Sequence, residues 1–153
     1  MAVRRGKTVF LGAPIGGGGG EAVLDLICLT AGALEQRGIT VLCEHLLIRE
    51  GKGGGTAEEI VRRNLDWLEE CRLAVFVLPG AGGIPLRSDG LFIELGWAAR
   101  SKKRIALAAD WGSAGGQSTV VKGLRALLPE FTLLPFDGPF EPDELARQIA
   151  ALL

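Results

Sequence analysis

Cysteine and histidine are scarce in this sequence. The 153 residues include three cysteines, Cys28, Cys43 and Cys71, and a single histidine, His45. The cysteines are odd in number, form no CxxC pair and stand in apolar stretches, so neither a disulfide framework nor a zinc site is indicated. We therefore expect reduced cysteines packed in the core, no bound metal and no cofactor.

An excess of charge of one sign is also missing. The 17 Lys and Arg residues are mixed along the chain with 18 Asp and Glu residues, and the formal net charge is -1. Such a chain lacks the basic field that holds a nucleic-acid backbone or an anionic membrane. The expected partner is a small molecule, with no nucleic acid and no membrane.

Long hydrophobic runs are absent, although 48% of the residues are apolar. No run approaches the about 20 residues that a membrane span needs. The apolar run after the basic N-terminus ends at Gly12-Ala13-Pro14, which is too short for a signal peptide. We expect one domain over residues 1–153, located in the cytoplasm, with a core that needs no disulfide or metal.

Short apolar runs alternate with segments of helical spacing. We predict strands at 8–11, 40–43, 73–78, 104–109 and 131–136, and helices over 22–38, 60–71, 91–101, 120–127 and 142–153. Thr56 and Glu59 form a predicted capping box, and Pro142 opens the last helix. Apolar strands alternating with helices are typical of a parallel sheet covered on both faces. The predicted fold class is α/β, a flavodoxin- or Rossmann-like three-layer sandwich with a five-stranded parallel sheet.

Sheets of this kind bind ligands beyond the carboxyl ends of their strands. The loop after the first strand holds Gly12 and a glycine run from Gly16 to Gly20, which suggests a dinucleotide site. No acidic residue other than Glu44 ends the second strand, and a homopolymeric glycine run is typical of a lid or linker. An NAD site is therefore not favoured.

The loop after the third predicted strand brings polar groups to the edge of the sheet where ligands bind. It contains Arg87, Ser88 and Asp89 and leads into a helix whose first turn is predicted to hold Glu94. The helix macrodipole favours an anion there, so a purely structural role is one explanation. The other is catalytic, because an ionised carboxylate can attack or stabilise an oxocarbenium-like sugar carbon. We expect the neighbouring Phe92, Ile93 and Trp97 to limit access of water.

Two serines stand in polar or glycine-rich loops after strands. Ser88 lies ahead of the helix with Glu94, and Ser118 directly precedes the helix predicted from Val120. Backbone N–H groups at a helix N-terminus bind phosphate, and a hydroxyl adds to them. An ordinary N-cap explains either serine equally well.

Five segments in order carry a resemblance to a known family. They are Phe10-Leu11-Gly12, Thr40-Val41-Leu42-Cys43-Glu44-His45, Arg63-Asn64-Leu65-Asp66-Trp67-Leu68, Ile93-Glu94-Leu95-Gly96-Trp97-Ala98 and Ser118-Thr119-Val120-Val121-Lys122-Gly123. The chain resembles the nucleoside 2-deoxyribosyltransferase superfamily, and within it the 2′-deoxynucleoside 5′-monophosphate N-glycosidases and related pyrimidine nucleotide hydrolases.

The resemblance implies roles for individual residues. Glu94 would be the nucleophile, and Ser88 and Ser118 would contact the 5′-phosphate. The loop after the first strand would lie over sugar and base, and a homodimer is implied. The complete set of substrate-binding residues that we expect is Gly12, Pro14, Gly16, His45, Arg87, Ser88, Gly90 and Ser118. Of these, His45 is expected at the end of the second strand.

Asn64 departs from the family pattern, because it occupies the place of an aspartate that assists chemistry at the sugar and base. An amide forms hydrogen bonds but donates no proton as an acid. Asn64, Leu68 and Cys71 share one helical stripe, so the amide is expected to face the site. Asp66 lies about 200° further around the helix and should face solvent. Asp89 is the candidate for a second carboxylate.

We predict an N-glycosidase that cleaves the base–sugar bond of a nucleoside 5′-monophosphate or nucleoside through Glu94. Three alternatives stay open. One is a nucleoside 2-deoxyribosyltransferase. Another is a cytokinin-type phosphoribohydrolase, since Pro79-Gly80-Ala81-Gly82-Gly83 and Gly90-Leu91-Phe92-Ile93-Glu94 resemble a stretched PGGxGTxxE pattern. The third is a non-catalytic nucleotide-binding module, which Asn64 makes plausible.

Overall fold

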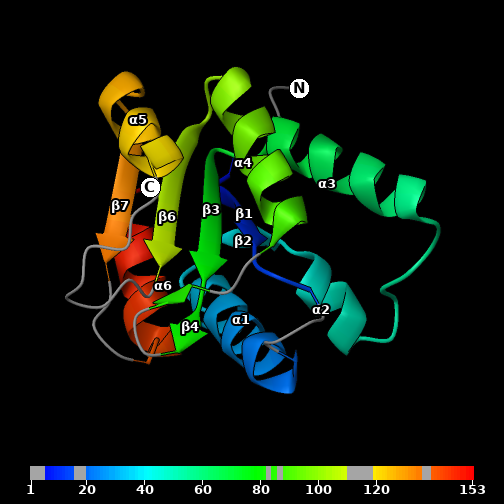
Figure 1. Cartoon of the computed structure of the whole chain (residues 1–153). Helices are drawn as coiled ribbons and strands as arrows, with labels where there is room; N and C mark the ends of the chain where they lie inside the picture. Colours follow the sequence, from blue (N-terminus) through cyan, green and yellow to red (C-terminus); the bar gives the residue numbers. More distant parts are fainter. Residues whose placement is uncertain (1–5, 16–19, 82–83, 86–87, 110–118, 136–138) are drawn as a thin grey trace.

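The centre of the molecule is a parallel sheet. The computed structural model describes residues 6–15, 20–81, 84–85, 88–109, 119–135 and 139–153. Its five-stranded sheet has the order β2-β1-β3-β6-β7, with every pairing parallel (Figure 1). The strands are β1 (Thr8–Gly12), β2 (Thr40–Leu42), β3 (Leu73–Leu78), β6 (Arg104–Ala109) and β7 (Phe131–Pro135). The predicted fold class is therefore confirmed.

Helices cover both faces of the sheet, which gives three layers (Figure 1). They are α1 (Gly20–Glu35), α2 (Glu44–Arg49), α3 (Ala57–Glu70), α4 (Asp89–Arg100), α5 (Thr119–Leu127) and α6 (Pro142–Ala151). One face packs against α1 and α6, and the other packs against α3, α4 and α5. Three elements were not predicted: the short helix α2, and the strands β4 (Gly80–Ala81) and β5 (Ile84–Pro85), which form a hairpin in the loop after β3.

The core has two halves because successive strand residues point to opposite faces. In β3, Leu73, Val75 and Val77 face α1 and α6. Phe76 and Leu78 face α3 and α4. Every residue of β3 is buried, which is why this strand reads as an uninterrupted apolar run.

The strand order places a topological switch point at β1 and β3. From β1 the chain crosses to β2 on one side, and the next strand, β3, lies on the other side of β1. In sheets of this order the crevice beyond the carboxyl ends of these two strands receives the ligand. The helices α2 and α4 both begin at this edge, since they follow β2 and β3 in the chain.

The capping prediction is confirmed, and two placements are wrong. Thr56 and Glu59 form a reciprocal capping box at the start of α3. His45 does not end a strand: β2 stops at Leu42, and His45 is in the first turn of α2. Glu94 is not in the first turn of its helix, because the Ser88 hydroxyl accepts the Leu91 N–H and starts α4 at Asp89. Glu94 therefore lies in the second turn.

The expected shielding by Phe92, Ile93 and Trp97 is also wrong. Helix α4 buries Leu91, Leu95 and Ala98 against the sheet. Phe92, Ile93 and Trp97 lie about 100–240° around the helical wheel from Leu91, outside this buried stripe, and point outward. They are 41%, 70% and 44% exposed, respectively.

The cysteines carry free thiols, as expected. Cys43 and Cys71 are buried in the core, whereas Cys28 is only half-buried. Burial raises the pKa of the Cys43 thiol to about 12, so this group stays protonated. Among the described residues no cluster of three or more His, Cys, Asp or Glu could hold a metal ion. No helix in the described ranges is long and apolar enough to span a bilayer.

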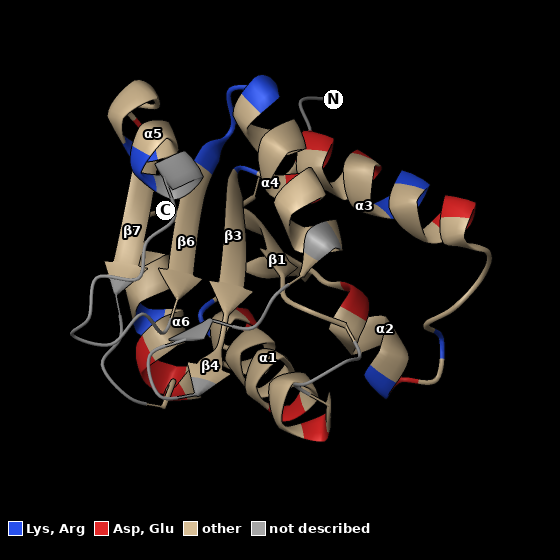
Figure 2. Cartoon of the chain, viewed as in Figure 1, with Lys and Arg blue, Asp and Glu red and all other residues tan. Residues whose placement is uncertain are grey.

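Charge is distributed over the surface without a dominant sign. Figure 2 shows Lys and Arg interspersed with Asp and Glu on the helices, in keeping with the formal net charge of -1. Much of this charge sits on exposed faces of α3 and α6, in pairs such as Arg62 with Glu58 and Arg147 with Glu144. Exposed pairs of this kind contribute little stability, about 0.2–1 kcal/mol each.

Candidate active site

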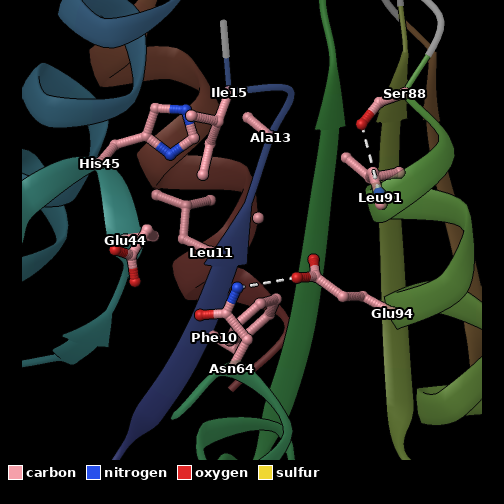
Figure 3. A pocket seen from close by; sticks show the side chains of 12 residues that line it. Phe10, Leu11, Ala13, Ile15, Glu44, His45, Asn64, Ser88, Leu91 and Glu94 are labelled. Carbon is pink, nitrogen blue, oxygen red and sulfur yellow. Dashed lines mark hydrogen bonds between the residues drawn. The ribbon is translucent and has the colours of Figure 1, made fainter. Parts of the chain in front are cut away.

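An open cavity of about 390 Å³ lies at the carboxyl ends of β1 and β3 (Figure 3). Only about 80 Å³ of this space can be occupied by the centre of a water-sized group, below the roughly 300–1,000 Å³ of small-molecule sites, so the cavity encloses only part of a nucleotide-sized ligand. The lining residues are Phe10, Leu11, Gly12, Ala13, Ile15, Glu44, His45, Asn64, Ser88, Gly90, Leu91 and Glu94. Six of the predicted site residues are among them, namely Gly12, His45, Asn64, Ser88, Gly90 and Glu94.

Glu94 and Asn64 meet in this cavity although they come from different helices. The Asn64 amide on α3 donates a hydrogen bond to Glu94 Oε1 on α4 at 2.8 Å (Figure 3). Asn64 is buried on the same stripe as Leu68, which confirms its predicted inward orientation. Asp66 is exposed, as the 200° rotation predicts.

The electrostatic setting of Glu94 differs from the expected one. Burial raises the pKa of the Glu94 carboxyl, the hydrogen bond from Asn64 lowers it, and the nearby negative charge of Glu44 raises it further. The net shift is upward. The N-terminus of α4 was expected to stabilise the ionised carboxylate, but the group that does so is the side-chain amide of Asn64. A carboxylate with little solvation and a raised pKa is a stronger base and nucleophile than an exposed one.

Gly12 keeps the second oxygen of Glu94 clear. A Cβ at this position would lie 2.9 Å from Phe10 Cε1, 3.4 Å from Phe76 Cδ1 and 3.5 Å from Glu94 Oε2. The first of these distances is a steric overlap with a buried ring, so a side chain here would displace the Phe10 ring. A Cβ would also contact Oε2, whereas glycine leaves that side of the oxygen uncovered while Oε1 is held by Asn64.

His45 lines the cavity from α2. Its Nε2 lies 3.1 Å from the carbonyl oxygen of Pro14, which is buried and does not line the cavity itself. Burial lowers the pKa of the imidazole, against smaller opposite effects of the Pro14 carbonyl and the Glu44 charge. The ring is therefore held neutral, with Nε2–H donating to Pro14. Pro14, a predicted substrate-binding residue, does not line the cavity but contacts the ring of His45, which does.

An ion pair between the buried, cavity-lining Glu44 and the half-buried Arg63 was not predicted. The Glu44 carboxylate is 5% exposed and binds the Arg63 guanidinium in a bidentate manner, with Nε–Oε2 at 3.0 Å and Nη2–Oε1 at 2.7 Å. The guanidinium also lies over the Trp67 ring, 5.7 Å from its centroid. The sequence held one indication of this pair. Glu44 directly follows an apolar strand, and a carboxylate buried at such a position requires a cation as its partner.

Ser88 lines the cavity and is the N-cap of α4. Its hydroxyl oxygen accepts the backbone N–H of Leu91 at 3.2 Å, so the capping explanation is confirmed. The start of α4 faces the cavity, since both Ser88 and Gly90 line it. A hydroxyl and free backbone N–H groups at one helix end form a suitable anion site.

For four predicted site residues, the structure describes either nothing or the backbone alone. Gly16, Arg87 and Ser118 lie outside the described residues. Asp89 is the first residue of α4, and its side chain also lies outside the described part of the chain.

The fold of the chain is similar to that of solved structures, whereas its sequence matches no family model. No model of a known protein family matches it, and no curated protein matches it. The structure of the CMP N-glycosidase BcmB from Clostridium botulinum aligns with 96% of this chain and 100% of that chain, with 20% identity and a TM-score of 0.66. The structure of BlsM aligns with 96% of this chain and 89% of that chain, with 20% identity and a TM-score of 0.72. The chain therefore shares the fold of a CMP N-glycosidase, which is the fold that the sequence resemblance to the nucleoside 2-deoxyribosyltransferase superfamily implies.

Proposed function

We propose that this protein is an N-glycosidase that cleaves the base–sugar bond of a nucleoside 5′-monophosphate, with Glu94 as the nucleophile. The observation that carries the proposal is the Glu94 carboxylate in the cavity at the switch point. Its Oε1 is fixed by Asn64 and its Oε2 lies beside Gly12. The shared fold with a CMP N-glycosidase and the motif resemblance support it.

The reaction would proceed in two steps with a covalent intermediate. Glu94 Oε2 forms a bond to the anomeric carbon of the sugar while the bond to the base breaks, and the base leaves with that electron pair and takes a proton from Asp89. Water then attacks the same carbon and returns a proton to Asp89, while the bond to Glu94 breaks, which releases the sugar phosphate and restores the carboxylate. Asp89 stays our proposed second carboxylate, because Ser88 and Gly90 on either side of it line the cavity.

The phosphate would bind at the start of α4, on the Ser88 side of the cavity. Ser88→Ala is expected to raise KM for a monophosphate about tenfold or more and to leave the nucleoside nearly unaffected, since a hydrogen bond to a charged group contributes about 1.5–3 kcal/mol. Thr56→Ala is the matched control, because it removes the N-cap of α3 away from the cavity. Steady-state kinetics on CMP and cytidine measures both variants, and an equal effect on both substrates would contradict the phosphate assignment.

The Asn64 hydrogen bond should set the acid limb of the pH–rate profile. Activity needs ionised Glu94, so it is lost as pH falls through the raised pKa of that carboxyl. Asn64→Asp replaces a donor by a second carboxylate, and like charges raise the pKa further. The acid limb is expected to move to higher pH by about one unit or more. Asp66→Asn, on the exposed face of α3, should leave the profile unchanged; an unchanged limb in Asn64→Asp would contradict the role of the amide.

A transferase would share the first step and differ in the second. There a free base, in place of water, takes the sugar from Glu94. Adding a second, labelled base during turnover separates the two reactions: labelled nucleotide indicates transfer, and free sugar phosphate indicates hydrolysis. A chain that binds nucleotide without either product would be a binding module.

We further propose that two copies pair through α4. Three large apolar side chains, Phe92, Ile93 and Trp97, are exposed on its outer face next to Glu94, and contiguous exposed apolar surface marks interaction sites. Ultracentrifugation is expected to show a dimer that Ile93→Glu converts to monomer. Leu29→Glu, at a 61% exposed position on α1, is the control and should stay dimeric. A monomeric wild type at micromolar concentration would contradict the pairing.

A further inference from the structure

Two carboxylates line the cavity, and each has a partner on α3. Glu44 comes from α2 and Glu94 from α4, and Figure 3 shows them on either side of Asn64. Asn64 donates to Glu94 Oε1 at 2.8 Å. The preceding residue, Arg63, donates three hydrogen bonds to the two oxygens of Glu44, at 2.7, 2.9 and 3.0 Å. Consecutive helical positions are about 100° apart, so one dipeptide reaches two neighbouring helices.

The two partners differ in charge. Arg63 is a permanent cation that matches the plane of the Glu44 carboxylate, and its other side lies over the Trp67 ring. This pair is fixed, because Glu44 is 5% exposed and Arg63 is held between a carboxylate and an aromatic ring. The Asn64 amide is neutral at every pH. The charge of Glu44 is therefore compensated at its origin, whereas the charge of Glu94 is only stabilised by a hydrogen bond.

Glu44 is the charged neighbour of Glu94 within the cavity. Of the described side chains that line it, the ionisable ones are Glu44, His45 and Glu94, and burial lowers the pKa of the His45 ring and keeps it neutral. Strand β3 is apolar, and the charge on β6, Arg104, lies at the far end of the strand and pairs with Glu130. The acidic residues of α3 beside α4 line a different hollow; they are Asp66, Glu69 and Glu70.

We propose that Arg63 is a positioning residue for the reaction at Glu94: by binding both oxygens of Glu44, it leaves Glu94 as the uncompensated carboxylate of the described cavity. This step rests on the proposed function, in which ionised Glu94 attacks the sugar. Without a cation, two carboxylates in one small site repel each other, and the pair retains one proton to higher pH. The dipeptide Arg63-Asn64 thereby makes Glu44 an inert ion and Glu94 the reactive one.

Two neutral variants should move the titration of Glu94 in opposite directions. Arg63→Gln removes the cation but keeps an amide that can donate to Glu44, and it is expected to raise the pH at which Glu94 ionises by about one pH unit. Glu44→Gln removes the repelling charge and frees the guanidinium, so Glu94 should ionise at lower pH. Combining both substitutions should bring the titration back to the wild-type position or below it. The control is Arg62→Gln, which makes the same change of charge in an exposed pair with Glu58 and should have no effect.

The experiment follows the Glu94 carboxyl by NMR and the reaction by kinetics. Glutamate labelled with carbon-13 at the side-chain carboxyl reports Glu94 and Glu44 and leaves Asp89 silent, and Glu94→Gln identifies the Glu94 signal. Base release from CMP is measured over the same pH range. The acid limb of the pH–rate profile is expected to move with the NMR titration in each variant, because activity needs ionised Glu94. Melting curves check that the variants are folded.

The outcomes distinguish this inference from the proposed function, because the NMR titration needs no turnover. Glu94 titrating as in wild type in folded Arg63→Gln, or a rise that persists when Glu44→Gln is added, overturns the role of Arg63 even where base release is fast. If Arg63→Gln does not fold, Glu44→Gln decides, and an unchanged or higher titration of Glu94 overturns the proposal. Opposite shifts in the two variants without base release from wild type would support control of Glu94 by Arg63 and overturn the N-glycosidase.

Discussion

Glu94→Gln is expected to lower base release by about a thousandfold or more, the scale of losing a catalytic nucleophile. The amide keeps the volume of the side chain and can still meet Asn64, but it does not attack the sugar carbon. Nucleotide affinity should change by less than about tenfold, because the carboxylate acts on the transition state. The measurement is single-turnover release of base beside calorimetric binding of the same nucleotide. Parallel losses of affinity and turnover would indicate a binding role.

The same variant has a consequence for stability. The pKa of the Glu94 carboxyl is raised in the folded protein above its usual value of 4.5. Ionisation of this group therefore costs folded-state stability as pH rises through the folded pKa, and the cost is absent below about 4.5. Glu94→Gln should be more stable than wild type at neutral pH, and the two should converge in acid. Thermal melts at pH 4 and pH 7 check this sign.

Arg63→Met is expected to destabilise the fold by about 2–4 kcal/mol, because it leaves a buried carboxylate without its cation. Glu44 is 5% exposed and accepts three hydrogen bonds from Arg63. Methionine keeps an unbranched side chain but removes the guanidinium, so the loss reports both its pairing with Glu44 and its contact with the Trp67 ring. Urea unfolding curves give the change in the free energy of unfolding.

The neighbouring residue provides the control. Arg62 pairs with Glu58 on the same helix, and both side chains are more than 70% exposed. Arg62→Met should cost no more than about 0.5 kcal/mol, as for other exposed pairs one helical turn apart. Equal losses in the two variants would mean that the Glu44–Arg63 pair contributes nothing beyond a surface pair.

The architecture could be predicted because its signals are local. A fully buried parallel strand needs apolar residues on both faces, so β3 stands out in the sequence from Leu73 to Leu78. Helix α2 was missed because its six residues hold too little periodicity to separate it from a loop. The sequence predicts the start of α4 at Leu91, which is too late, because Ser88 fits both a phosphate ligand and an N-cap. The hydrogen bond from the Leu91 N–H to the Ser88 hydroxyl fixes the start of the helix at Asp89.

The candidate site was predicted in part. Topology brings the ends of β1 and β3 together, so Gly12, Asn64 and Glu94 converge as expected. The pairing of Glu44 with Arg63 depends on how α3 packs beside α2, which no local pattern specifies. The same holds for the Pro14 carbonyl that fixes the His45 ring.

The central claim is that Glu94 attacks the sugar, and peptide mass spectrometry during turnover tests it most directly. Wild type is mixed with CMP or dCMP, quenched in acid within the first turnover and digested. We predict free base in solution together with a sugar-phosphate adduct on the peptide that carries Glu94, and no adduct in Glu94→Gln. Base released without any adduct at Glu94, or no base released from any nucleoside monophosphate, would contradict the account.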